Sequence, residues 1–206
     1  TTVEHHSNFL PWQRLADEQD ASMTVVPHDE LDDTADYVDE QTNIVAITHM
    51  RNVTGEYVPV EDIAKSVKER SDAFIVVDGC QAFPHQSINI GDTAIDAYVF
   101  SAHKHYGPTG IGITYLDESY HETIEPPLVG GGMVNQVSKN DYEPNGSPHR
   151  FESGTLNAAG IAGSKEALRF LEENRAAIRE KEADILSYAL KKLDEAGFEY
   201  YGHDEN

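Results

Sequence analysis

One lysine, Lys104, stands between two histidines in the stretch FSAHKHYGPTGIG, residues 100–112. Basic residues are scarce here, with 15 Lys and Arg against 37 Asp and Glu. A lysine in such a setting can be a point charge for a phosphate, a surface residue, or a nucleophile that condenses with an aldehyde. The residues that surround it in the fold must decide between these uses.

Polar side chains follow two of the apolar runs that we expect to be strands. FIVVD ends on Asp78, and AYVFS ends on Ser101, just before His103 and Lys104. In open α/β sheets, ligands bind beyond the carboxyl ends of the strands. Pyridoxal 5′-phosphate (PLP) needs a lysine for its aldehyde, a carboxylate for its ring nitrogen, and hydroxyl, imidazole or N–H groups for its phosphate. These four residues could supply them, although the residue types alone also fit a phosphorylated sugar.

The elements that must position these groups are short apolar runs alternating with amphipathic segments. β-Branched and aromatic residues predict strands, and apolar residues at helical spacing predict helices. The expected strands are 23–27, 43–49, 74–78, 97–101 and 111–116, and the expected helices are 8–20 and 60–72. Strands alternating with helices indicate an α/β fold with a mainly parallel sheet that helices cover on both faces.

The second half of the chain has a different pattern. Residues 117–156 are rich in Gly, Pro and polar residues and predict loops, and a loop region of this length is typical of functional segments. A long helix is expected over 157–196, with Gly197 as its stop signal. FEYYG, residues 198–202, then predicts the start of another strand.

Charge and composition exclude several classes of protein. The net charge of −22 repels nucleic acid and anionic membranes. The acids are dispersed, which favours a solvated surface adapted to high salt over an acidic docking face for a basic partner. No run of 18 apolar residues predicts a transmembrane helix, and the lone Cys80 fits a reducing, cytoplasmic compartment.

Five ordered stretches resemble a known family. VVDGCQAFPH (76–85) and AIDAYVFSAHKHYGPTGIGITYL (94–116) resemble the PLP signature of class V aminotransferase-like enzymes. The stretches EHHSNFLPWQRLA (4–16), AITHMRNVTGE (46–56) and HRFESGTLNAAGIAG (149–163) resemble group II cysteine desulfurases of the sulfur-mobilising type. The resemblance runs nearly end to end and implies the large domain of PLP-dependent transferase fold type I.

The resemblance implies a role for each motif residue around the cofactor ring. Lys104 aligns with the lysine that condenses with the PLP aldehyde and shuttles protons. Asp78 aligns with the acid paired to the ring nitrogen, and Gln81 with the residue at the phenolic oxygen. His5 aligns with the imidazole that stacks on the ring and assists proton transfer. The catalytic residues implied are therefore Lys104 and His5.

The remaining motif residues are implied to bind the phosphate or lie near the substrate. Ser101 and His103 align with phosphate ligands, and Asn52 aligns with an asparagine near the substrate. Thr155 aligns with a threonine that reaches the phosphate of a neighbouring subunit, which implies a homodimer with shared sites. No metal ligands are implied.

The implied reaction converts L-cysteine to L-alanine and leaves a persulfide whose sulfur passes to an acceptor protein for iron–sulfur cluster assembly. The nucleophilic cysteine and the substrate arginine of the family match no motif in this chain, and Cys80 is expected to be a packing residue. We therefore expect a central fragment: a PLP-binding large domain over 1–160 without its N-terminal part, then a linking helix and the start of a small domain over 161–206. A selenocysteine lyase, another class V PLP enzyme, and an inert scaffold fragment unable to retain PLP remain alternatives.

Overall fold

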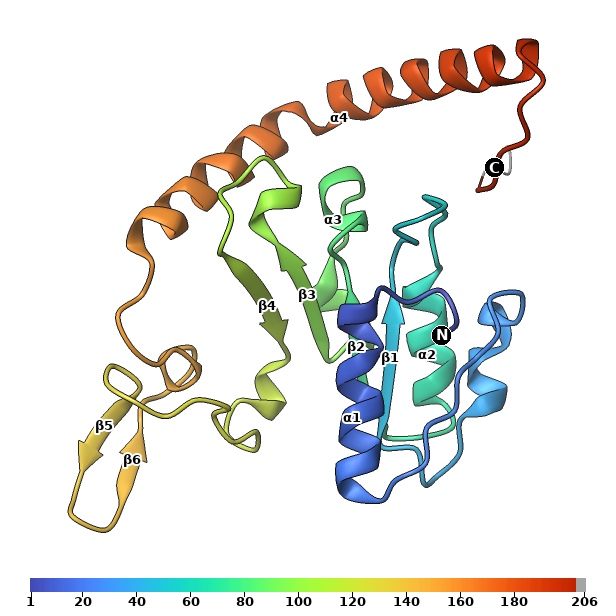
Figure 1. Cartoon of the computed structure of the whole chain (residues 1–206). Helices are drawn as coiled ribbons and strands as arrows, with labels where there is room; N and C mark the ends of the chain where they lie inside the picture. The colour runs from blue at the N-terminus through green and yellow to red at the C-terminus, as the bar shows by residue number, and fades with distance from the viewer. Residues whose placement is uncertain (203–206) are drawn as a thin grey trace.

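The computed structural model describes residues 1–202 and contains a four-stranded sheet in the order β1-β2-β3-β4 (Figure 1). The strands are β1 (Ile44–Thr48), β2 (Phe74–Asp78), β3 (Ala97–Ser101) and β4 (Gly112–Leu116). The first three are parallel, and β4 is antiparallel to β3 because the short turn between them leaves no room for a crossover. Four of the predicted strands and the mainly parallel α/β class are thus confirmed.

One face of the sheet carries the hydrophobic core. Alternate strand residues such as Ile75, Val77 and Tyr98 point to this face, where α2 (Val60–Lys68) packs against them with an apolar stripe that includes Ile63. Because successive residues of a strand point to opposite faces, Asp78 belongs to the other face of the sheet. The core therefore fixes the face on which the polar strand ends lie.

The remaining helices differ greatly in length. The α-helices are α1 (Leu10–Gln19), α3 (Ala82–His85) and α4 (Ala158–Glu195), and the 3₁₀ turns are η1 (His6–Asn8), η2 (Leu31–Tyr37), η3 (Ile90–Asp92), η4 (Ala102–Lys104), η5 (Glu118–Tyr120) and η6 (His149–Phe151). The predicted stop of α4 is confirmed, since Gly197 has a φ of 74° and the Phe198 N–H donates to the Leu193 carbonyl. No helix within residues 1–202 has the length and apolar character needed to cross a bilayer.

The predicted loop region 117–156 contains a hairpin that the sequence pattern does not predict. Its strands, β5 (Val134–Val137) and β6 (Tyr142–Pro144), pair in antiparallel register and lie apart from the main sheet in Figure 1. Both strands are short and largely exposed, so they lack the apolar alternation from which a strand is predicted.

Two strand predictions were wrong. Within the part of the chain that the structure describes, residues 23–27 and 198–202 belong to neither sheet and so form no strand. A crevice of about 760 Å³ is lined by residues of the first of these segments, by β1 and by α1. The end of the second predicted segment, residues 203–206, lies outside the described residues.

Candidate functional site

The carboxyl ends of the three parallel strands meet around Asp78. Thr48 pairs with Asp78 across β1 and β2, and Asp78 pairs with Val99 across β2 and β3. The ladder continues past the strands, since the His49 N–H donates to the Asp78 carbonyl at 2.9 Å and the Gly79 N–H donates to the Val99 carbonyl at 2.8 Å. This edge of the sheet is where a ligand site of such a fold is expected.

Three of the predicted site residues gather around the Cys80 thiol. The Cys80 N–H donates to Asp78 Oδ1 at 2.9 Å, and Cys80 Sγ lies 3.7 Å from Ser101 Oγ. Burial raises the pKa of the Cys80 thiol to about 11, and Asp78 adds to this, while the Ser101 hydrogen bond and the charge of Lys104 oppose it. The thiol is therefore protonated near neutral pH, which makes it a poor nucleophile.

A tyrosine supports the turn after Asp78 from the core side. A Cβ on Gly79 would lie 2.0 Å from the Tyr98 ring, so only glycine allows this close approach. The Tyr98 hydroxyl lies 2.9 Å from His49 Nδ1, and both side chains are buried. Burial lowers the pKa of His49 to about 4 and raises that of Tyr98, so the pair is neutral. This contact gives His49 a structural role.

Aromatic packing joins α3 to the turn that carries Lys104. Phe83 of α3 stacks on Phe100 of β3, with ring centroids 3.9 Å apart. His105, which follows Lys104 and is fully buried, contacts both rings at centroid distances of 5.3 and 5.6 Å. Burial lowers the pKa of His105, so its ring is neutral and packs as an apolar group. The lysine turn is thus anchored on the core.

Arg175 of α4 holds the same region from outside. Its Nη1 donates to the carbonyls of Phe83, Pro84 and Gln86 at 2.7, 3.2 and 3.0 Å, and its guanidinium lies over the Phe83 ring. These carbonyls close the C-terminal end of α3, where a helix leaves acceptors without partners. The sequence does not predict a role for Arg175, because nothing in its own segment points to a contact 92 residues away.

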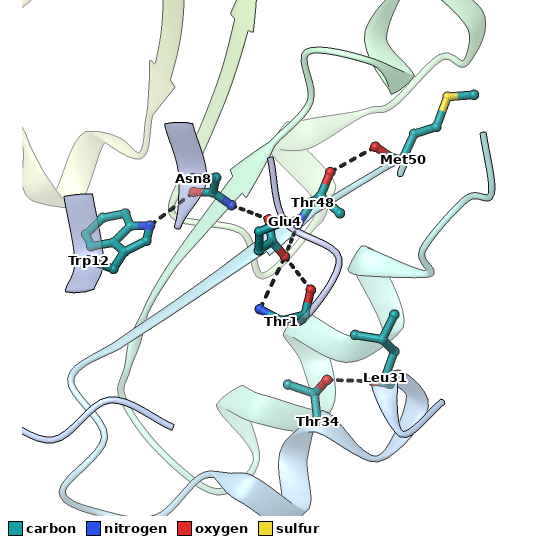
Figure 2. A network of polar contacts seen from close by, with 8 residues as sticks. All are labelled: Thr1, Glu4, Asn8, Trp12, Leu31, Thr34, Thr48 and Met50. Carbon is teal, nitrogen blue, oxygen red and sulfur yellow. Dashed lines mark hydrogen bonds and ion pairs between the residues drawn. The ribbon is translucent and has the colours of Figure 1, made fainter. Parts of the chain in front are cut away.

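His5 lies in a turn that is fastened to the end of β1. Its Nδ1 accepts a hydrogen bond from the Ser7 N–H at 3.1 Å, and the ring is exposed. The preceding residue, Glu4, accepts from the Thr48 N–H at 2.9 Å (Figure 2). Because Thr48 pairs with Asp78, the His5 turn is docked on the strand next to the one that ends in the proposed ring-nitrogen acid.

The other predicted residues lie in turns around or beyond this edge. Gln81 stands at the start of α3, and His103 is exposed in η4. Asn52 is exposed in the turn after β1, and Thr155 is exposed in the loop that joins β6 to α4. Their ligands stay predictions, and Thr155 is not among the residues grouped at the strand ends.

The groups at this edge fit PLP by their chemistry. The Lys104 amine, the Asp78 carboxylate and the Ser101 hydroxyl all influence the pKa of the half-buried Cys80 thiol. The three groups therefore lie in the same part of the molecule. They match the needs of an aldehyde, a ring nitrogen and a phosphate, respectively. Within residues 1–202, His, Cys, Asp and Glu side chains form no group that could hold a metal ion.

Comparison with known proteins extends this match to the whole chain. The sequence profile described as "Aminotransferase class-V" matches residues 1–206. The chain belongs to the class V aminotransferase family. The prediction of the family is thereby confirmed, and with it the expected α/β large-domain fold.

The relatives of this family member that resemble it include cysteine desulfurases. It is 38% identical to a probable cysteine desulfurase of Halalkalibacterium halodurans over 98% of its own length and 51% of the relative's. It is 37% identical to a cysteine desulfurase of Enterobacter sp. over 94% of its length and 49% of the relative's. The chain spans about half the length of the curated relatives it matches.

A solved structure gives the same result for the fold. The apo structure of a cysteine desulfurase from Thermococcus onnurineus matches with a TM-score of 0.92 at 33% identity, covering 100% of this chain and 52% of that one. Cysteine desulfurase CsdA from Escherichia coli matches with a TM-score of 0.74 at 33% identity, covering 84% of this chain and 45% of that one.

Proposed function

We propose that this chain is the cofactor-binding part of a PLP-dependent cysteine desulfurase of group II. The observation that carries the proposal is the grouping of Asp78, Ser101 and Lys104 around one half-buried thiol at the carboxyl edge of the sheet. The reaction converts L-cysteine to L-alanine and leaves the sulfur as a persulfide on an enzyme cysteine, for transfer to an acceptor protein that serves iron–sulfur cluster assembly.

In this proposal each residue of the strand-end site has a definite task. When bound, PLP supplies an electron sink for the bond broken at the substrate Cα. Lys104 binds the cofactor aldehyde and moves the proton at Cα, and Asp78 keeps a carboxylate at the ring nitrogen. Ser101 and His103 bind the phosphate, Gln81 contacts the phenolic oxygen, and His5 covers the ring.

The sulfur-accepting step is assigned to a residue other than Cys80. A persulfide forms when a thiolate attacks the substrate sulfur, and the Cys80 thiol, with its pKa raised to about 11, supplies little thiolate near neutral pH. We therefore propose that the chain alone has little or no desulfurase turnover.

The family pattern leads to further proposals about the domains, the subunits and the environment of the protein. Residues 1–160 form the PLP-binding domain and 161–206 lead into a second domain. Asn52 faces the substrate, and Thr155 reaches the phosphate of a second subunit in a homodimer. The dispersed acidic surface suits a salt-rich cytoplasm.

The test is the covalent attachment of PLP to Lys104. Wild-type protein incubated with PLP should absorb in the near-visible, and borohydride reduction should fix the cofactor on the peptide that contains Lys104, as read by mass spectrometry. Lys104→Ala should lose both signals, whereas Lys65→Ala, which changes an exposed lysine of α2, should keep them. A wild-type protein that stays colourless, or label spread over several lysines, would favour an inert scaffold.

A second measurement addresses the missing nucleophile. Alanine and sulfide released from cysteine by the PLP-loaded chain should stay near background. Sustained turnover that disappears in Cys80→Ser would contradict the assignment and make Cys80 the sulfur acceptor.

A further inference from the structure

A buried carboxylate immediately precedes His5. The Glu4 side chain is 1% exposed and belongs to the N-terminal segment, ahead of η1. Its Oε1 accepts from the Thr1 hydroxyl at 2.6 Å and from the Thr48 N–H at 2.9 Å, and the backbone nitrogen of Thr1 lies 3.4 Å away. Its Oε2 accepts from Asn8 Nδ2 at 2.6 Å. Burying a carboxylate is costly unless donors satisfy it, so this arrangement indicates a specific use.

The hydrogen-bond network requires a side chain at position 4 that accepts through both of its terminal atoms, as the two Glu4 oxygens do. The Trp12 indole can only donate, and its Nε1 lies 3.0 Å from Asn8 Oδ1 (Figure 2). This bond fixes the Asn8 amide so that its NH₂ group faces Glu4. A glutamine at position 4 would therefore direct its own NH₂ group at a donor, whereas a carboxylate accepts at both ends.

The same carboxylate supplies a partner for the edge of the sheet. Within residues 1–202, β1 pairs with β2 alone, and the Thr48 N–H donates to a side chain rather than to a strand carbonyl. Glu4 Oε1 takes the place of that carbonyl and ties the N-terminal segment to the end of β1. His5 directly follows Glu4 in the chain, and its ring accepts a hydrogen bond from the Ser7 N–H in the same turn.

We propose that Glu4 is a positioning residue for His5. Its carboxylate holds the turn of residues 4–8 against the end of β1, so that the His5 ring has a fixed place beside β1, the strand that pairs with the one ending in Asp78. The inference rests on the proposed function only in that His5 then acts on the cofactor ring. The docking of the turn stands without it.

The test exchanges the charged and neutral partners of the network. Glu4→Gln sets two NH₂ groups against each other. Adding Asn8→Asp restores complementary bonds, because the aspartate accepts from Trp12 and from the new glutamine, whose oxygen still accepts from Thr48. The double variant also keeps the net charge of the wild type, so it is a matched control.

The first readout needs no cofactor. Backbone order parameters of His5 and Ser7 should fall from the rigid range, about 0.85, to below about 0.6 in Glu4→Gln, and the double variant should restore them. Unchanged order parameters in Glu4→Gln would overturn the proposal. If Glu4→Gln is too unstable to measure, the double variant decides the test: order parameters in the rigid range support the proposal, and lowered ones contradict it.

The second readout is PLP affinity in a double-mutant cycle. Glu4→Gln should weaken PLP binding about ten-fold, as expected for one lost buried hydrogen bond, and should have no further effect in a His5→Ala background. An equal loss in both backgrounds would show that Glu4 does not act through His5. If wild-type protein binds no PLP, the proposed function fails, and the order parameters alone decide the role of Glu4.

Discussion

The two halves of α4 form one continuous helix but have different surroundings. The buried residues of the helix all lie in its first half, at the three- to four-residue spacing of a packed face: Gly160, Ser164, Ala167 and Leu171. In the second half, the large apolar residues Ile185 and Tyr188 are 55% and 65% exposed. Figure 1 shows this half extending away from the sheet.

Two causes therefore keep α4 helical along its whole length. Packing on the turn before β4 and on α3 orders the first half, where Phe170 contacts Tyr106 and Arg175 reaches the end of α3. The second half is rich in Ala, Glu, Lys and Arg, which have high helix propensity. Substitutions in the two halves should therefore have unequal effects on the free energy of unfolding.

The largest expected effect is at Leu171, which is 1% exposed. Leu171→Ala should lower the free energy of unfolding by about 2–5 kcal/mol, because it leaves a cavity at the helix–body contact. Ile185→Ala, in the second half, should change it by no more than about 0.5 kcal/mol. Denaturant midpoints of the two variants check the comparison, and similar losses would show that the second half is also packed.

The next effect concerns acid stability of the packed body. With the pKa of His49 lowered to about 4, the unfolded chain binds more protons than the folded one between pH 6.5 and 4. Stability from this group is complete above pH 6.5 and is lost as the pH falls to 4, to a total of about 3 kcal/mol. Unfolding midpoints measured across this range should fall more steeply in the wild type than in His49→Gln, which cannot titrate.

The carboxylates of this acidic chain titrate over part of the same range, so the difference between the two proteins is the quantity of interest. Parallel profiles for wild type and His49→Gln would contradict a neutral buried His49.

The smallest of these effects lies at the boundary between the two halves. Arg175→Met should cost about 1–3 kcal/mol, because three carbonyls at the end of α3 lose their donor. Arg179→Met, one turn further along and exposed, is the matched control and should have little effect. Chemical denaturation measures both, and equal effects would place the boundary beyond residue 179.

The local sequence predicted those elements whose apolar residues are buried in the structure. Residues 74–78 and 97–101 form strands with the predicted bounds, because both faces of these central strands are covered. Residues 23–27 also contain two adjacent valines but have no partner strand within residues 1–202, so their pattern alone was misleading. The hairpin β5–β6 was missed because its strands are stabilised by pairing rather than by a buried face.

The candidate site shows the same division. Motifs predicted Asp78, Ser101 and Lys104, and the fold brings them together. The groups that support them come from distant parts of the chain: Glu4 bonds to Thr48, and Arg175 bonds to α3. No local pattern marks such contacts, since they depend on which elements become neighbours in space.

The single cysteine of the chain has a practical consequence. Its thiol is protonated, half-buried and within the influence of both Asp78 and Lys104, so a thiol-directed reagent should modify it more slowly than a free, exposed cysteine. The rate of alkylation thus reports how often the strand-end turns expose the Cys80 thiol, on a timescale of minutes to hours. One native atom serves as a reporter, without the need to introduce a dye or a tag.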